Sequence, residues 1–347
     1  MRHGRTVRSS GGMQCGMWLL TAVLTGGVAL GETCTTQSQM AAAERDVLAS
    51  VARSLAAKVQ ASDVEGVRAA TVAEYAKDFG AISYAVSTTA PKLEGGVPMV
   101  EQVYLLDASD LKKGADGLAP DAQFFCSLNK TVAEADFLIP GLPPGQYGFV
   151  MVPVNGGLAP WRLSFLLRKE QGGWQMAGFY PKATTAAGHD GLWYWTQARG
   201  MVTRKELWNA WLHFGQAETL LVPAGFVQST HLEKLRTERT AAAPSALSDG
   251  VTAETPLVVK GKGGMEYRFT GLGVDDSLAK EKVDVVAHLK VDAVADMVAA
   301  RKRNTDAMSA LLGAYPEMRK AFHGVWIFAE AAGQNPFATE QAMSEIP

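Results

Sequence analysis

The spacing of hydrophobic residues changes along the chain. Over residues 40–80 apolar positions recur every three or four residues, which predicts a helix with one apolar stripe; the stripe consists of Val47, Leu48, Val51, Leu55 and Val59. A second short helix is expected after Ser62 and Asp63, either of which can cap it. From 82 to 180 the apolar residues gather in short aliphatic and aromatic runs separated by Gly and Pro, which predict strands. These runs span 100–106, 123–128, 147–152 and 161–167, and a hairpin is expected over 165–179.

Helices followed by antiparallel strands indicate an α+β domain over residues 40–182. This order, with the closing segment 172–179 (Gly-Gly-Trp-Gln-Met-Ala-Gly-Phe), resembles the NTF2-like or SnoaL-type domain. The resemblance implies helices on a curved antiparallel sheet around an open pocket. Residues 137–147, however, resemble a turn of the carboxypeptidase-regulatory-like β-sandwich modules. Two architectures therefore remain open for this domain: the cone of NTF2-like domains, which is a curved sheet covered by helices, and a β-sandwich.

Residues 188–236 predict a helical hairpin, with helices near 191–200 and 204–220. Aligned on Ala210, the segment resembles a single tetratricopeptide repeat; its packing positions would be Tyr194, Ala198, Met201, Ala210, Phe214 and Ala217. One such repeat cannot bury its own apolar face. The resemblance therefore implies a hairpin that packs on a neighbouring domain or braces two parts of the chain.

The carboxy-terminal third predicts a second, smaller domain. Residues 237–254 are rich in small residues with Pro and Gly, which is typical of a linker. Residues 255–333 predict a β-β-β-α-β order, with the helix over 294–312 and the last strand over 322–329. Residues 334–347 are expected to be a mobile tail.

Residues 1–31 have the layout of a secretory signal peptide, because three arginines precede an apolar run over 17–30 and no acid occurs before Glu32. The run is shorter than the ~20 residues that a spanning helix needs. Small residues place the expected cleavage between Gly31 and Glu32. The sequence thus predicts a periplasmic or secreted protein without stable membrane insertion after cleavage, which begins with a flexible segment over 32–39.

Charge and cysteine content narrow the class of protein. Cleavage would leave 30 basic and 35 acidic residues, a net charge of −5. A net negative chain is a poor binder of nucleic acid. Cleavage would also leave two cysteines, Cys34 and Cys126, which can pair in an oxidising compartment. The alternative is that Cys126 is a small buried apolar residue.

Motifs for catalysis or metal binding are not coherent in this sequence. The histidines of the expected mature chain are scattered without the spacing of metal ligands, and no cofactor is indicated; they are His189, His213, His231, His288 and His323. Half of the eight tryptophans fall in the hairpin, and with His189 they are the binding candidates; they are Trp193, Trp195, Trp208 and Trp211. Tryptophan is frequent in binding hot spots, but these residues can equally fill a core, and we favour the core. Asp190 beside His189 is expected to cap a helix.

The sequence favours an exported, non-catalytic binding or assembly protein of the bacterial cell envelope. Its partner would be another envelope protein at the hairpin or a small apolar ligand in the first domain. The alternative is a carrier, hydrolase or isomerase that uses the pocket of the first domain; its acid–base groups would come from Glu74, Asp78, Asp107, Tyr84 and Tyr104. A pocket filled with apolar side chains would argue against this alternative.

Overall fold

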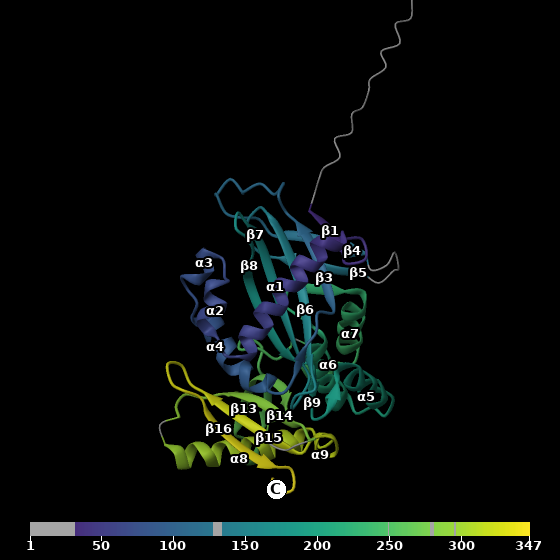
Figure 1. Cartoon of the computed structure of the whole chain (residues 1–347). Coiled ribbons are helices and arrows are strands. Elements are labelled where there is room, and N and C mark those ends of the chain that lie inside the picture. The colour runs from purple at the N-terminus through teal and green to yellow at the C-terminus, as the bar shows by residue number, and fades with distance from the viewer. Residues whose placement is uncertain (1–31, 128–133, 249, 278–280, 295) are drawn as a thin grey trace, which may run out of the picture. The chain divides into compact units, whose positions relative to one another are not determined.

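The computed structural model describes residues 32–127, 134–248, 250–277, 281–294 and 296–347. It contains helices and several largely antiparallel sheets, so the predicted α+β class is confirmed (Figure 1). The expected signal peptide over 1–31 lies outside the described residues. Within them, no helix combines the length and the hydrophobicity needed to cross a membrane.

The first domain begins with a helical layer. Its main helix, α1, spans Ala42–Gln60, followed by α2 (Val64–Ala69), α3 (Ala73–Ala76), α4 (Gly80–Thr89) and the 3₁₀ turn η1 (Ala90–Leu93). The predicted stripe of α1 is partly correct: Leu48, Leu55 and Val59 are buried, but Val47 is half exposed. Ala52 and Ala56 complete the buried face of this helix. The Asp63 side chain accepts a hydrogen bond from Gly66 N and caps α2, one of the two caps expected from sequence.

One face of the main sheet packs against these helices. The sheet runs in the order β1-β3-β6-β7-β8, every neighbouring pair antiparallel, and β2 pairs with β6. The strands are β1 (Thr33–Thr36), β2 (Val97–Pro98), β3 (Gln102–Asp107), β6 (Gln146–Asn155), β7 (Trp161–Glu170) and β8 (Gly173–Ala183). Leu48 and Leu55 of α1 meet Val150 and Phe165 of the sheet in one buried cluster.

The second face of the main sheet is covered by a small sheet. This sheet has the order β11-β5-β4 and consists of β4 (Ala122–Ser127), β5 (Glu134–Ile139) and β11 (Val227–Ser229). Phe124 and Phe137 of the small sheet share a buried cluster with Tyr104 and Phe149 of the main sheet. Phe137 packs edge-on against Tyr104 and Phe149, with ring centroids 5.1 Å and 5.2 Å apart. The domain thus combines the helices expected for a cone with the second sheet expected for a sandwich.

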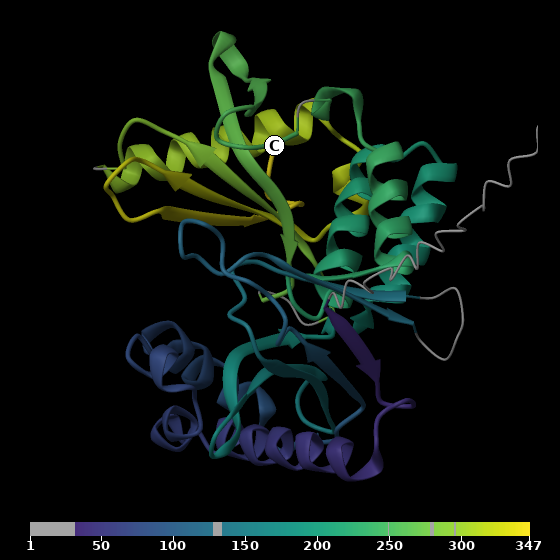
Figure 2. The ribbon, with the colours of Figure 1, turned by 90° about the horizontal axis from the view of Figure 1, so that it is seen from above.

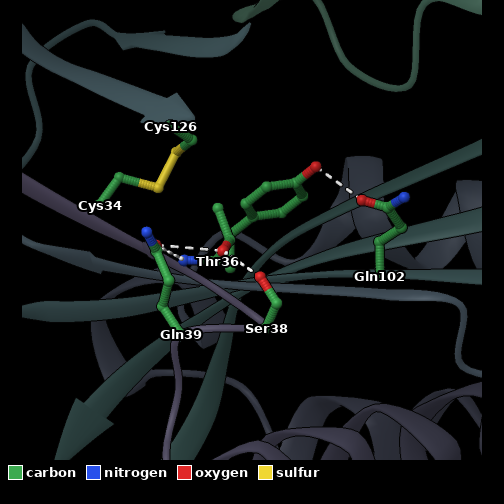
Figure 3. Close-up of a disulfide and its surroundings, with 7 residues drawn as sticks. Cys34, Thr36, Ser38, Gln39, Gln102 and Cys126 are labelled. Atoms are coloured by element: carbon green, nitrogen blue, oxygen red, sulfur yellow. Dashed lines mark hydrogen bonds between the residues drawn. A yellow bond between two sulfur atoms is a disulfide. The ribbon is translucent and has the colours of Figure 1, made fainter. Parts of the chain in front are cut away.

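A disulfide joins an edge strand of the main sheet to an edge strand of the small sheet. Cys34 on β1 bonds to Cys126 on β4, with Cα atoms 5.3 Å apart (Figure 3). The prediction that residues 32–39 are flexible is wrong for Thr33–Thr36, because this segment pairs with β3 along its whole length. Gln39 Oε1 then accepts hydrogen bonds from the backbone N and the hydroxyl of Thr36, which close the turn into α1 (Figure 3). This segment is ordered by backbone hydrogen bonds to β3, and such bonds do not depend on whether the side chains are polar.

The two-helix hairpin predicted over residues 188–236 follows a short β-hairpin, and a third helix that the sequence analysis did not predict packs beside it. The short strands β9 (Thr185–Ala186) and β10 (His189–Asp190) lead into α5 (Gly191–Thr203), α6 (Leu207–Leu221) and α7 (Thr230–Ala241). Figures 1 and 2 show these three helices side by side. The predicted linker over 237–254 is helical at its start, continues into the 3₁₀ turn η2 (Ser245–Leu247), and buries Ala242 and Leu247. The linker was predicted from its content of small residues, and this prediction fails where Ala242 and Leu247 pack into the core.

The carboxy-terminal domain is a five-stranded sheet with the order β12-β13-β14-β15-β16. Its elements are β12 (Leu257–Lys260), η3 (Lys262–Gly264), β13 (Glu266–Asp275), β14 (Asp284–Lys290), α8 (Met297–Ala314), α9 (Met318–Ala321), β15 (Gly324–Glu330) and β16 (Phe337–Ala342). Strands β14 and β15 are parallel, and α8 connects them. Buried Met308 and Leu311 of α8 belong to the same cluster as Phe269 of β13 and Tyr194 and Phe214 of the hairpin. The hairpin therefore packs on this domain, one of the two outcomes expected for a lone repeat.

The tail predicted to be mobile is part of the carboxy-terminal sheet. Strand β16 pairs with β15, and Met343 and Ile346 beyond it are buried. The Arg319 guanidinium on α9 donates hydrogen bonds to the carbonyl oxygens of Met343 and Ile346, each at 3.0 Å. A guanidinium offers several donors in a rigid fork, so one side chain can bind several carbonyl oxygens of the tail at once.

We expect Arg319→Ala to lower the free energy of unfolding by about 1.5 kcal/mol, because hydrogen bonds from a charged donor are lost. Chemical denaturation measures this change. The matched control is Arg268→Ala, which removes an arginine whose side chain is 53% exposed and paired with the surface carboxylate of Glu266; it should change stability by less than about 1 kcal/mol. Equal effects of the two substitutions would show that Arg319 does not anchor the tail.

Candidate functional site

The four tryptophans of the hairpin occupy different environments. Trp195 and Trp208 are each only 7% exposed, so for them the core interpretation fits. Trp195 Nε1 donates a 2.7 Å hydrogen bond to Oε2 of Glu238 on α7. The ring centroids of Trp208 and Tyr315 are 4.0 Å apart. Trp211 is partly buried beneath the guanidinium of Arg239. Trp193 differs from the other three, because 37% of it is exposed.

Trp193 forms a parallel stack with His189. The two ring centroids are 3.8 Å apart and the rings are inclined by 7°. Asp190 accepts a 2.8 Å hydrogen bond from Trp193 N and caps α5, as expected from sequence. The cap fixes Trp193 in the first helical turn, directly after the strand that carries His189. The Tyr194 ring meets the Trp193 ring edge-on at 5.0 Å and completes an aromatic wall.

This stack lines a cleft of about 340 Å³ between the helical hairpin and the carboxy-terminal domain. The hairpin side contributes four aromatic rings. The opposite side comes from residues 281–283 before β14, from Lys320 and Ala321 at the end of α9, and from Phe322 and His323 between α9 and β15. The cleft is lined by Ala187, His189, Trp193, Tyr194, His213, Glu281, Lys282, Val283, Lys320, Ala321, Phe322 and His323.

A buried histidine, His213 of α6, also lines the cleft. It is 4% exposed, and its Nδ1 lies 2.9 Å from the backbone oxygen of Asn209. A carbonyl oxygen can only accept, so Nδ1 carries the proton and Nε2 is left with a lone pair. Burial lowers the pKa of His213 to about 4, against a weaker opposing effect of the Asn209 hydrogen bond. The ring is therefore neutral near pH 7, and no hydrogen bond among the described residues engages Nε2.

A third histidine, His323, stands on the opposite wall. Its Nδ1 is 3.1 Å from Oδ1 of Asp284, which is completely buried at the start of β14. Burial raises the pKa of the Asp284 carboxyl, and the hydrogen bond with His323 opposes this shift. An Asp–His pair of this kind fixes the ring and leaves the other ring nitrogen available as an acceptor or base.

The charged residues on the cleft wall are two lysines and one glutamate. Lys282 and Lys320 carry the positive charges and Glu281 the negative one. Tyr194 contributes the only hydroxyl among the described lining residues, and it donates to the backbone oxygen of Ala186. Across the part of the chain that the structure describes, no three His, Cys, Asp or Glu residues lie close enough to hold a metal ion. The arrangement offers a flat aromatic wall, the ring acceptor of His213 and, among the described lining residues, one more positive than negative side chain.

The structure separates the acid–base candidates of the first domain. Glu74 pairs with Arg168 at 3.5 Å, Asp78 and Tyr84 are exposed, and buried Tyr104 donates its hydroxyl hydrogen to Gln102. Asp107 accepts hydrogen bonds from the side chain of Gln146 and the backbone of Ser109. These groups do not converge, and buried side chains cover both faces of the main sheet.

Sequence reasoning found one edge of the cleft and missed the rest. His189 and Trp193 were recognisable because they flank a helix cap within five residues. His213 lies on α6, Asp284 begins β14 and His323 lies in the loop before β15, and their separation in sequence carries no motif. Comparison with known proteins adds no assignment: no family model matches the chain, and no curated protein or solved structure matches it.

Proposed function

We propose that this protein is an exported binding protein of the cell envelope whose cleft takes a small aromatic anion that carries a hydrogen-bond donor. The carrying observation is the neutral His213, which lines the cleft and whose Nδ1 is paired with the backbone oxygen of Asn209, so that Nε2 is the acceptor of the ring. A ligand N–H or O–H that reaches Nε2 gains a hydrogen bond in a site that holds little water.

The other lining groups support the remaining parts of this ligand. The parallel rings of Trp193 and His189 suit a flat aromatic body. Lys282 and Lys320 outnumber Glu281 and favour a negatively charged substituent. An aliphatic cation could neither stack on these rings nor pair with the lysines. We therefore favour an aromatic anion.

Two observations support export. The amino-terminal 31 residues have the layout of a signal peptide. The disulfide between Cys34 and Cys126 is of a kind that persists in oxidising compartments and is rare in the cytosol. The periplasm or the outside of the cell is therefore the location we propose.

A second candidate function rests on His323 and Asp284. The pair has the geometry of an oriented general base, so the same cleft would serve a small-molecule hydrolase or isomerase. This candidate predicts turnover that His323→Gln abolishes while ligand affinity is retained. Binding without turnover in a broad screen of ester and isomerase substrates favours the first candidate.

We expect indole-3-acetate to bind more tightly than its N-methyl analogue, which has the same ring and charge but no N–H. The loss of one hydrogen bond to His213 should weaken binding roughly five- to tenfold. Isothermal titration calorimetry measures both affinities. In His213→Phe the two probes should bind equally, because the acceptor is gone.

Trp193→Ala should weaken indole-3-acetate binding by about tenfold, since a stacked aromatic contact is worth about 1 kcal/mol or more. The matched control is Trp174→Ala, which removes a partly exposed tryptophan of β8 that packs on the first domain. If the wild-type protein does not distinguish the two probes, or if the Trp174 and Trp193 variants bind alike, the cleft is not the site.

A further inference from the structure

A second concave surface lies on the face of the carboxy-terminal sheet opposite α8. Three aromatic side chains form a row there, in which His288 on β14 stacks on Phe328 of β15 and Phe328 stacks on Trp326. The ring centroids are 5.6 Å and 5.7 Å apart, with interplanar angles of 20° and 9°. His288 and Phe328 are direct partners in the strand register, and Trp326 is two residues along β15. All three side chains are partly exposed.

Glycines leave a trough beside this aromatic row. Gly271 pairs with His288 and Gly273 pairs with Val286, so two same-face positions of β13 have no side chain. A Cβ atom added at Gly273 would meet no atom within 4 Å, whereas one added at Gly271 would lie 3.2 Å from the His288 ring, so the open part of the trough is at Gly273. The resulting groove has a volume of about 560 Å³. Glycine in a strand interior often marks a place where another molecule approaches the backbone closely.

The charges at the groove are acidic. Asp275 lines it, and among the described lining residues none is a lysine or an arginine. Asp275 is also the direct cross-strand partner of Asp284. Like charges directly opposite one another destabilise a sheet. On the next strand, Glu340 is the register partner of Trp326. His288, which also lines the groove, has its Nδ1 2.7 Å from a carboxylate oxygen of Glu330.

We propose that this groove binds a small organic cation with a flat apolar body. The flat body lies in the glycine trough against Trp326 and Phe328, and its positive charge lies at Asp275. Two effects favour this class of ligand: a cation is attracted to the face of an aromatic ring, and a positive charge relieves the repulsion between Asp275 and Asp284. The ligand has the opposite charge from the one proposed for the cleft, and the site shares no lining residue with it.

The test uses tryptamine as the probe, with indole-3-acetate as the matched probe of opposite charge and the same ring. Calorimetric titration of the full chain should show tryptamine binding that Asp275→Asn weakens about three- to tenfold. Gly273→Leu should weaken it at least tenfold, because the new side chain fills the trough. Gly172→Leu, at an open position of the β7–β8 turn, is the control and should bind tryptamine as the wild type does.

The outcomes separate this site from the cleft. His213→Phe should leave tryptamine affinity unchanged, and Gly273→Leu should leave indole-3-acetate affinity unchanged. The proposal is overturned if tryptamine does not bind, if Gly273→Leu and Asp275→Asn both bind it as the wild type does, or if His213→Phe abolishes its binding. Thermal melting of each variant establishes that a lost affinity does not come from a lost fold.

Discussion

Removal of the disulfide between Cys34 and Cys126 is expected to lower the free energy of unfolding by about 4 kcal/mol. The two cysteines are 92 residues apart in sequence, so the bond closes a long loop of the unfolded chain. It also fastens β1, whose short polar sequence contributes few buried side chains, to β4. We expect β1 to separate from β3 before the rest of the sheet opens in the reduced protein.

Denaturation by urea, followed by circular dichroism, measures this loss with and without a reducing agent. Cys34→Ser combined with Cys126→Ala should lower stability to the same extent as reduction does. The reducing agent should then have no further effect on this double variant. Reduction that leaves the wild-type denaturation curve unchanged would contradict the expectation, provided that thiol counting shows the bond to be open.

The free energy of unfolding is expected to fall by about 3 kcal/mol as the pH drops from 6.5 to about 4, through His213 alone. The pKa of this histidine is about 4 in the folded protein and takes its ordinary value of 6.5 in the unfolded chain. Between these values the unfolded chain binds more protons than the folded one, so falling pH favours unfolding. Above pH 6.5 neither state binds the proton, and the contribution of His213 to stability is fully present.

His213→Gln isolates this effect, because glutamine can still donate to the backbone oxygen of Asn209 but does not titrate. Stability measured from pH 4 to pH 7 should vary less in this variant than in the wild type, by about 3 kcal/mol. Asp284, whose pKa is also shifted, is present in both proteins, so its contribution cancels in the comparison. Parallel curves for the two proteins would show that His213 titrates normally.

The elements that sequence predicted well are those in which side-chain periodicity decides the structure. The apolar spacing that includes Leu48, Leu55 and Val59 specifies α1, and the packing positions around Ala210 specify the hairpin. Strand β1 and strand β16 escaped prediction because backbone pairing to an edge orders them, and their polar side chains give no alternation. The tail additionally depends on Arg319, which reaches back to it from α9.

The candidate site followed from sequence only where neighbours in the chain are neighbours in space. His189 and Trp193 stack across the start of one helix, so their contact is between residues that are close in sequence and could be predicted from it. The acceptor of His213 and the pair of His323 with Asp284 depend on how the hairpin packs on the carboxy-terminal sheet. A tertiary contact of this kind has no pattern in a single sequence, which is why scattered histidines gave no motif.

The most direct test of the proposed function is a titration with indole-3-acetate followed by NMR on protein labelled with ¹⁵N at the tryptophan indoles. Each indole N–H gives one resonance, and Trp→Phe variants assign those of Trp193 and Trp326. A ligand in the cleft should shift the Trp193 resonance and leave those of Trp174 and Trp326 in place. A spectrum in which Trp193 does not move at saturating ligand, or in which Trp326 moves instead, would contradict the proposed binding cleft.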